Sequence, residues 1–151
     1  MLVETGTYLG EKVDAMKNVF TEIYSIEPGE ELARNARRRF APERHVTILQ
    51  GNSSNVLRDL LPRLTRPWLF WFDAQYSGGV TATDSSASPL EDELSCIFAH
   101  PLAHDHVVLI DDARLLGRES RYPTPEALQS LVRSSGFKTC EVKDDIVRIH
   151  S

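Results

Sequence analysis

The chain has 151 residues and a formal net charge of −5, with 41% hydrophobic and 26% charged residues. This size and balance are typical of one globular domain with a sizeable core, so we expect residues 1–151 to form a single domain. The acidic balance and the lack of a long basic run argue against a protein that binds a nucleic-acid backbone. Since no apolar run is long enough to span a membrane, we expect neither a membrane partner nor a signal peptide.

Two cysteines, Cys96 and Cys140, fall in a helical pattern and in a strand pattern. Two isolated thiols indicate a reducing compartment and not a disulfide framework, so we expect a cytoplasmic protein in which both are core residues.

Short, nearly continuous apolar runs alternate with helical patterns along most of the chain. Such runs are typical of strands that are buried on both faces of a parallel sheet. The predicted strands lie at residues 2–3, 23–26, 46–49, 68–72 and 107–110. Between them, apolar residues recur at helical spacing, and a last helix is marked by Thr124 as its cap, Pro125 in its first turn and Gly136 at its end.

The last fifteen residues break this alternation. Residues 137–142 and 146–149 are predicted strands, and Lys143-Asp144-Asp145 forms the tight turn between them. The final pair is therefore a hairpin, and the last strand runs antiparallel to its neighbour. The predicted fold class is α/β: a Rossmann-like, mostly parallel, doubly wound sheet with a C-terminal antiparallel hairpin, in three α/β/α layers.

The first thirty residues carry the pattern of an adenosine-binding site. A short strand runs into a turn that contains Gly6 and Gly10, a helix follows, and a second strand ends on Glu27. Glycines let the backbone approach a ligand, and an acid at the end of the second strand accepts hydrogen bonds from ribose hydroxyls. A nicotinamide cofactor is disfavoured, because its motif prefers a different spacing of glycines.

The whole pattern resembles the class I S-adenosylmethionine-dependent methyltransferases over nearly the full chain. The resemblance implies that the first turn wraps the methionine end of S-adenosylmethionine, that Glu27 binds the ribose, that the turn after the third strand contacts adenine, and that an acid after the fourth strand lies beside the methyl group. The residues that it assigns to the cofactor are Glu4, Thr5, Gly6, Thr7, Tyr8, Gly10, Glu27, Gly51, Asn52, Ser53, Asp73 and Ala74. Tyr8 departs from the family pattern, since it replaces the middle glycine.

Three acids follow the fourth and fifth predicted strands and suggest a metal site. Asp73, Asp111 and Asp112 should meet at one edge of the sheet, where their charges repel unless a cation lies among them. Oxygen ligands of this kind suit Mg²⁺, and the placement resembles metal-dependent O-methyltransferases, in which the ion activates the acceptor hydroxyl. The alternative is that Asp112 caps a turn and Asp111 is solvated.

The resemblance implies an enzyme, a methyltransferase that transfers a methyl group to a hydroxyl of a small molecule. Asp73 and Tyr76 are its candidate catalytic residues, because no lysine follows Asp73 and the histidines lie toward the other edge of the sheet.

The chain begins almost at its first strand, whereas methyltransferases of this class carry helices before it, so the sequence is a trimmed fragment, or a partner subunit covers the site, or the site is open. An uncovered site should expose apolar surface, so we expect self-association into a homo-oligomer or a partner subunit. The alternative function is a non-catalytic methyltransferase-like module that binds a nucleoside or a protein partner.

Overall fold

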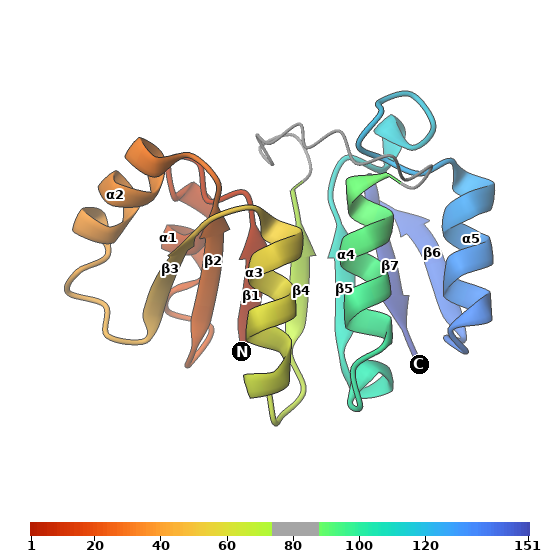
Figure 1. The fold of residues 1–151 in the computed structure, drawn as a ribbon, viewed down its shortest axis with the longest axis horizontal. Helices are drawn as coiled ribbons and strands as arrows, with labels where there is room; N and C mark the ends of the chain where they lie inside the picture. Colours follow the sequence, from red (N-terminus) through yellow and green to blue (C-terminus); the bar gives the residue numbers. More distant parts are fainter. Residues whose placement is uncertain (74–87) are drawn as a thin grey trace.

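The computed structural model describes residues 1–73 and 88–151, in which seven strands form one sheet in the order β3-β2-β1-β4-β5-β7-β6 (Figure 1). The strands are β1 (Leu2–Thr5), β2 (Ile23–Glu27), β3 (Val46–Gln50), β4 (Leu69–Phe72), β5 (Val107–Ile110), β6 (Thr139–Lys143) and β7 (Ile146–His150). Strands β1 to β5 pair in parallel, and β7 is antiparallel to both β5 and β6. The predicted mostly parallel sheet with a C-terminal hairpin is confirmed.

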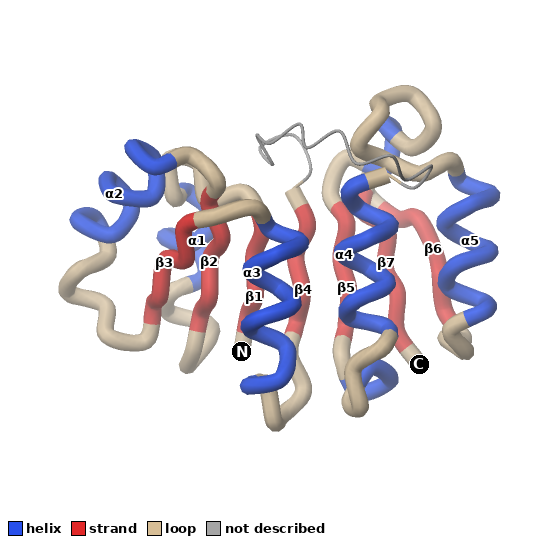
Figure 2. The backbone as a smooth tube through the Cα atoms, in the orientation of Figure 1, coloured by secondary structure: helices blue, strands red, loops and turns tan. Residues whose placement is uncertain are grey.

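Helices and 3₁₀ turns connect the strands and cover the sheet (Figure 2). They are α1 (Glu11–Met16), α2 (Glu30–Arg39), α3 (Ser53–Leu60), η1 (Leu61–Arg63), α4 (Pro89–Phe98), η2 (Ala103–Asp105), η3 (Ala113–Leu115) and α5 (Pro125–Ser134). Helices α3, α4 and α5 lie in front of the sheet in Figure 1, and α1 lies behind it. This gives the three layers that the sequence predicts.

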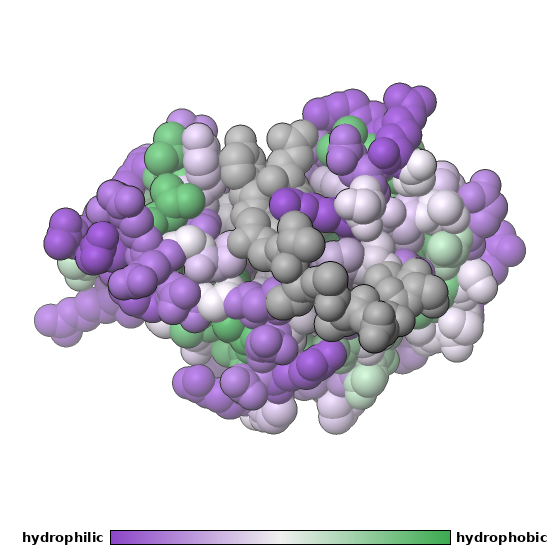
Figure 3. Space-filling view, turned by 45° about the horizontal axis from the view of Figure 1, so that its top comes forward, coloured by the Kyte–Doolittle hydropathy of each residue, from purple (hydrophilic) through white to green (hydrophobic). Residues whose placement is uncertain are grey.

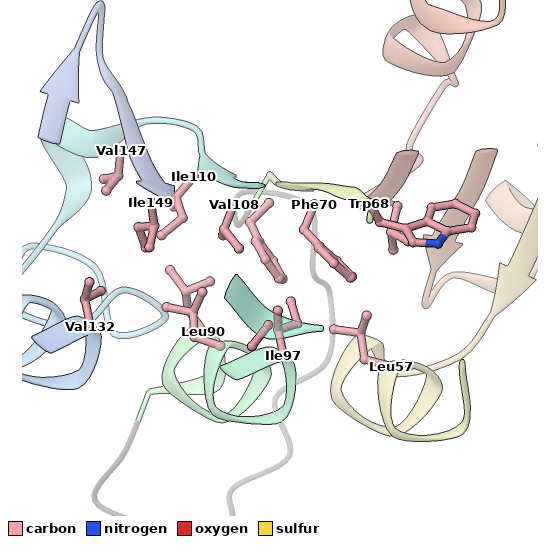
Figure 4. Packing of buried hydrophobic residues seen from close by; sticks show 14 of the residues in the cluster. Leu57, Trp68, Phe70, Leu90, Ile97, Val108, Ile110, Val132, Val147 and Ile149 are labelled. Atoms are coloured by element: carbon pink, nitrogen blue, oxygen red, sulfur yellow. The ribbon is translucent and has the colours of Figure 1, made fainter. Parts of the chain in front are cut away.

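The main core lies between the sheet and α3, α4 and α5. Side chains at alternate strand positions, such as Phe70, Val108 and Ile149, point toward Leu57 of α3 and Ile97 of α4 (Figure 4). A smaller core behind the sheet joins α1 and α2 to β3 and consists of Val13, Ala33, Ala36, Phe40 and Ile48. On β4 and β5, the other alternate positions are only partly covered: Leu69, Trp71 and Leu109 are half-buried, and Val107 is exposed.

Local chemistry explains where the elements end. Asp144 and Asp145 both have positive φ, 54° and 61°, as a two-residue hairpin turn between twisted strands requires. The hydroxyl of Thr124 accepts a hydrogen bond from the amide of Ala127 and caps α5, as predicted, and Gly136 follows the helix with a φ of 82°.

The cysteines are free thiols, and both Cys96 and Cys140 are half-buried against the main core. Within the described ranges, no helix combines the length and the apolar character needed to cross a membrane.

Candidate functional site

The turns after β1, β2, β3 and β5 gather at the carboxyl edge of the sheet together with Asp73, which follows β4, and this edge is where open α/β sheets bind ligands. Figure 3 brings this edge forward and shows hydrophilic side chains on both of its flanks. The amide of Gly6 donates to the Ile26 carbonyl (2.9 Å), the amide of Gly51 donates to the Glu27 carbonyl (3.0 Å), and the amide of Asp111 donates to the Phe72 carbonyl (2.9 Å). These bonds hold neighbouring turns together, so the sequence-predicted residues of the first, second and third turns share one edge.

The first turn needs glycine at its end for a steric reason. Gly10 has a φ of 79°, and a Cβ atom placed there would lie 2.7 Å from Cε2 of Phe40, the residue that caps the end of α2. A side chain at this position would push the start of α1 away from α2. The glycine therefore permits the close contact of two helices in addition to the turn.

Tyr8 occupies a glycine-like conformation in the middle of the same turn. Its φ is 49° and its side chain is 40% exposed. A left-handed conformation costs a residue other than glycine about 1–2 kcal/mol. The turn is therefore left-handed at Tyr8, a conformation that glycine adopts at a lower cost.

The carboxylate of Glu27 joins the first turn to the second. Its Oε2 accepts from the amide of Tyr8 and its Oε1 accepts from the amide of Gly29, each at 2.8 Å. The residue is 2% exposed. A carboxylate offers about four lone-pair sites, so two acceptor positions remain after these bonds are made.

A buried polar chain lies beneath the first turn. Ser25 donates to Oε2 of Glu4 at 2.7 Å, and the hydroxyls of Ser25 and Thr7 are 2.6 Å apart. Burial raises the pKa of Glu4 to about 7, while the hydrogen bond from Ser25 and the charge of Lys12 act in the opposite direction. The hydroxyl of Thr5 is buried and has no hydrogen-bond partner in the described part of the chain.

The third turn is anchored to α4. Asn52 caps α3 by accepting from the amide of Asn55 at 3.3 Å, and the next hydroxyl, that of Ser53, donates to Oε1 of Glu93. Burial raises the pKa of Glu93 to about 7. Nothing in the local sequence predicts this contact, because Ser53 and Glu93 lie 40 residues apart.

Asp73 follows β4 and Asp111 follows the adjacent β5, as predicted, but cations of the chain itself pair with the acids after β5. Nζ of Lys12 lies 3.2 Å from Oδ2 of Asp111 and 3.6 Å from the centre of the Trp71 ring. Nη1 of Arg114 lies 2.6 Å from Oδ1 of Asp112. Lys12 is a site residue that the sequence reasoning missed.

The predicted magnesium site is not supported. Within residues 1–73 and 88–151, no three acids, histidines or cysteines gather into a group that could hold a metal ion, and this includes Asp73, Asp111 and Asp112. The physical reason is that Lys12 and Arg114 already compensate the charges that were expected to require a cation. Two further predicted residues, Ala74 and Tyr76, lie outside the described residues.

The histidines before β5 lie at the opposite, amino edge, as the sequence predicts. His106 is 1% exposed and its Nδ1 accepts from the amide of Trp68 at 3.1 Å. Burial is the main cause that lowers the pKa of His106 to about 4. These residues take no part in the carboxyl-edge site.

Comparison with known proteins agrees with this geometry. No protein-family model matches the sequence, and no curated protein matches it significantly. Solved structures do match, and 138 chains reach significance. The fold is that of the class I S-adenosylmethionine-dependent methyltransferases.

Three of these structures illustrate the likeness. The SAH-bound methyltransferase PaMTH1 of Podospora anserina has a TM-score of 0.64 and 17% identity, over 99% of this chain and 70% of its own. A TehB-like SAM-dependent methyltransferase from Corynebacterium glutamicum has a TM-score of 0.62 and 13% identity, and the match covers 99% of this chain and 79% of that one. A SAM-dependent methyltransferase from Aquifex aeolicus has a TM-score of 0.51 and 13% identity, and the match covers 98% of this chain and 79% of that one.

Proposed function

We propose that this protein binds S-adenosylmethionine at the carboxyl edge of its sheet and transfers the methyl group to a hydroxyl of a small molecule. The observation that carries the proposal is the buried Glu27 carboxylate, which lies at the end of β2 between two turns and keeps two acceptor positions. The neighbour solved with SAH supports the choice of cofactor.

The described residues fit such a ligand. Glu27 would accept hydrogen bonds from both ribose hydroxyls. The turn from Gly6 to Gly10 would surround the methionine part, near the unpartnered hydroxyl of Thr5. Asn52 and Ser53, held by Glu93, would border the adenine. When bound, S-adenosylmethionine supplies an electrophilic methyl group.

The acceptor would lie between the ends of β4 and β5. Asp73 would be adjacent to the methyl group, and Asp111, oriented by Lys12, would take the proton from the acceptor hydroxyl. The ammonium group of Lys12 would stabilise negative charge on that oxygen, which is the role first predicted for Mg²⁺. Tyr76 stays a predicted catalytic residue.

Calorimetry with S-adenosylmethionine and S-adenosylhomocysteine tests the binding. Glu27→Ala should weaken binding by about 2–3 kcal/mol, because it removes a charged acceptor from two hydroxyls. The matched control is Glu31→Ala, an exposed acid in the first turn of α2, and this variant should bind like the wild type. Equal affinity in the Glu27 and Glu31 variants would overturn the ribose assignment.

Turnover tests the chemistry separately. Incubation of S-adenosylmethionine with a panel of phenols and sugars should release S-adenosylhomocysteine in the wild type and about a hundredfold less in Asp111→Asn, which is the lower end of the effect of general base catalysis. Binding without turnover on any acceptor would instead indicate the alternative, a module that holds a nucleoside and does no chemistry.

A further inference from the structure

An open cavity far from the carboxyl edge is lined by residues at the ends of α3 and α4. These helix ends lie at the bottom of Figure 1. Its volume is about 530 Å³, which is within the range of small-molecule sites. The walls come from the end of α3, from η1, from Cys96 near the end of α4 and from the segment after α4, all of which lie at the amino edge. Leu61, Pro62, Ala99 and Pro101 make most of this lining apolar.

A hydrogen-bonded histidine pair gives one wall of the cavity a defined donor. Nδ1 of His106 accepts from the amide of Trp68, and the low pKa of His106 keeps its ring neutral near pH 7. A neutral imidazole has one N–H, so Nε2 of His106 carries it and donates to Nδ1 of His100 at 3.0 Å. The amide of Leu102 donates to the same atom at 3.2 Å.

His100 is therefore held as one tautomer. Its Nδ1 accepts two hydrogen bonds, so its proton is on Nε2. The ring stacks on that of His106 with centroids 5.0 Å apart, which holds its orientation. His100 lines the cavity, and its Nε2 has no hydrogen-bond partner among residues 1–73 and 88–151.

Arg58 adds a cation to the same cavity. It comes from α3 and is exposed, and its guanidinium has neither a hydrogen-bond nor an ion-pair partner within the described parts of the chain. No acidic residue is among the described residues that line the cavity. An oriented N–H donor and an uncompensated guanidinium, set in apolar walls, are complementary to an anion with an apolar body.

We propose that the cavity between α3 and α4 is a binding site for a small organic anion, such as an aryl carboxylate. The carboxylate would contact Arg58 and Nε2 of His100, and the ring would lie against Leu61 and Pro101. The site is separate from the proposed cofactor edge, and the inference does not depend on methyl transfer.

Benzoate is a suitable probe, and benzamide is its uncharged counterpart with the same ring. Titrations followed by ¹H–¹⁵N NMR should show saturable binding of benzoate, with a shift of the His100 ring signals and about tenfold weaker binding of benzamide. Arg58→Met should weaken benzoate binding about tenfold. Arg63→Met is the matched control, because Arg63 lines a different cavity with Arg37 and Asp59, and it should leave the affinity unchanged.

The alkylation rates of the two cysteines give a second measurement of benzoate binding, in which one cysteine serves as the control for the other. Cys96 lines the cavity, whereas Cys140 lies on β6. Bound benzoate should slow the alkylation of Cys96 by iodoacetamide and leave the rate at Cys140 unchanged. Equal affinity for benzoate and benzamide, an unchanged affinity in Arg58→Met, or no protection of Cys96 would overturn the proposal. Benzoate binding should persist in Glu27→Ala, so failure of the cofactor proposal would leave this result intact.

Discussion

Glu93→Gln should stabilise the protein above neutral pH. The Glu93 side chain is 4% exposed, and burial raises its pKa from an ordinary value of 4.5 to about 7. This difference corresponds to about 3 kcal/mol of unfolding free energy once the group is ionised in both states. Glutamine keeps the carbonyl oxygen that accepts from Ser53, so the contact between α3 and α4 should persist.

The sign of the pH dependence of this stability difference follows from proton linkage. Below the unfolded pKa of 4.5, Glu93 is neutral in both states, and the two proteins should have similar stability. As the pH rises, the unfolded chain releases the proton first while the folded protein retains it up to about pH 7, so the wild type loses stability relative to the variant. The full difference should be present above about pH 7.

Urea unfolding at several values from about pH 4 to about pH 8 measures this difference. Glu4 and His106 also titrate in this range, but they are present in both proteins and cancel in the comparison. Glu141→Gln, at an exposed position on β6, is the control and should show no pH-dependent gain. A Glu93→Gln difference that is constant with pH, or a variant that is less stable near pH 8, would refute the reasoning.

Three further predictions concern the carboxyl edge and the assembly state. Tyr8→Gly should raise the unfolding free energy by about 1 kcal/mol, because it relieves a left-handed conformation, and a loss of stability in urea would contradict this. Millimolar MgCl₂ should leave the wild-type melting temperature unchanged, since Lys12 and Arg114 already pair with Asp111 and Asp112; a rise that EDTA reverses would restore the metal hypothesis. Sedimentation velocity tests the expected self-association, which a concentration-independent monomer would exclude.

The strands and helices could be predicted from the sequence because their signals are local. Residues 107–110 were predicted as a strand with the bounds that the structure has, and Thr124 and Gly136 mark the ends of α5 as expected. Parallel strands bring their carboxyl ends to one edge, so the positions of Glu27 and Asn52 followed from the order of elements alone. The left-handed conformation of Tyr8 was not predicted, because the sequence showed only that a tyrosine replaces a glycine there.

The electrostatics of the site depended on tertiary packing. The contact between Lys12 and Asp111 joins residues 99 apart in the chain, and the fold brings the ammonium group of Lys12, on α1, over the ring of Trp71 on β4. The sequence showed the acids but no cation beside them, which led to the prediction of magnesium. Glu93 likewise looks like an ordinary helix residue until the packing of α3 against α4 buries it beside Ser53. Local patterns determine which residues reach an edge of the sheet, whereas the charge at that edge is set by side chains that distant helices bring to it.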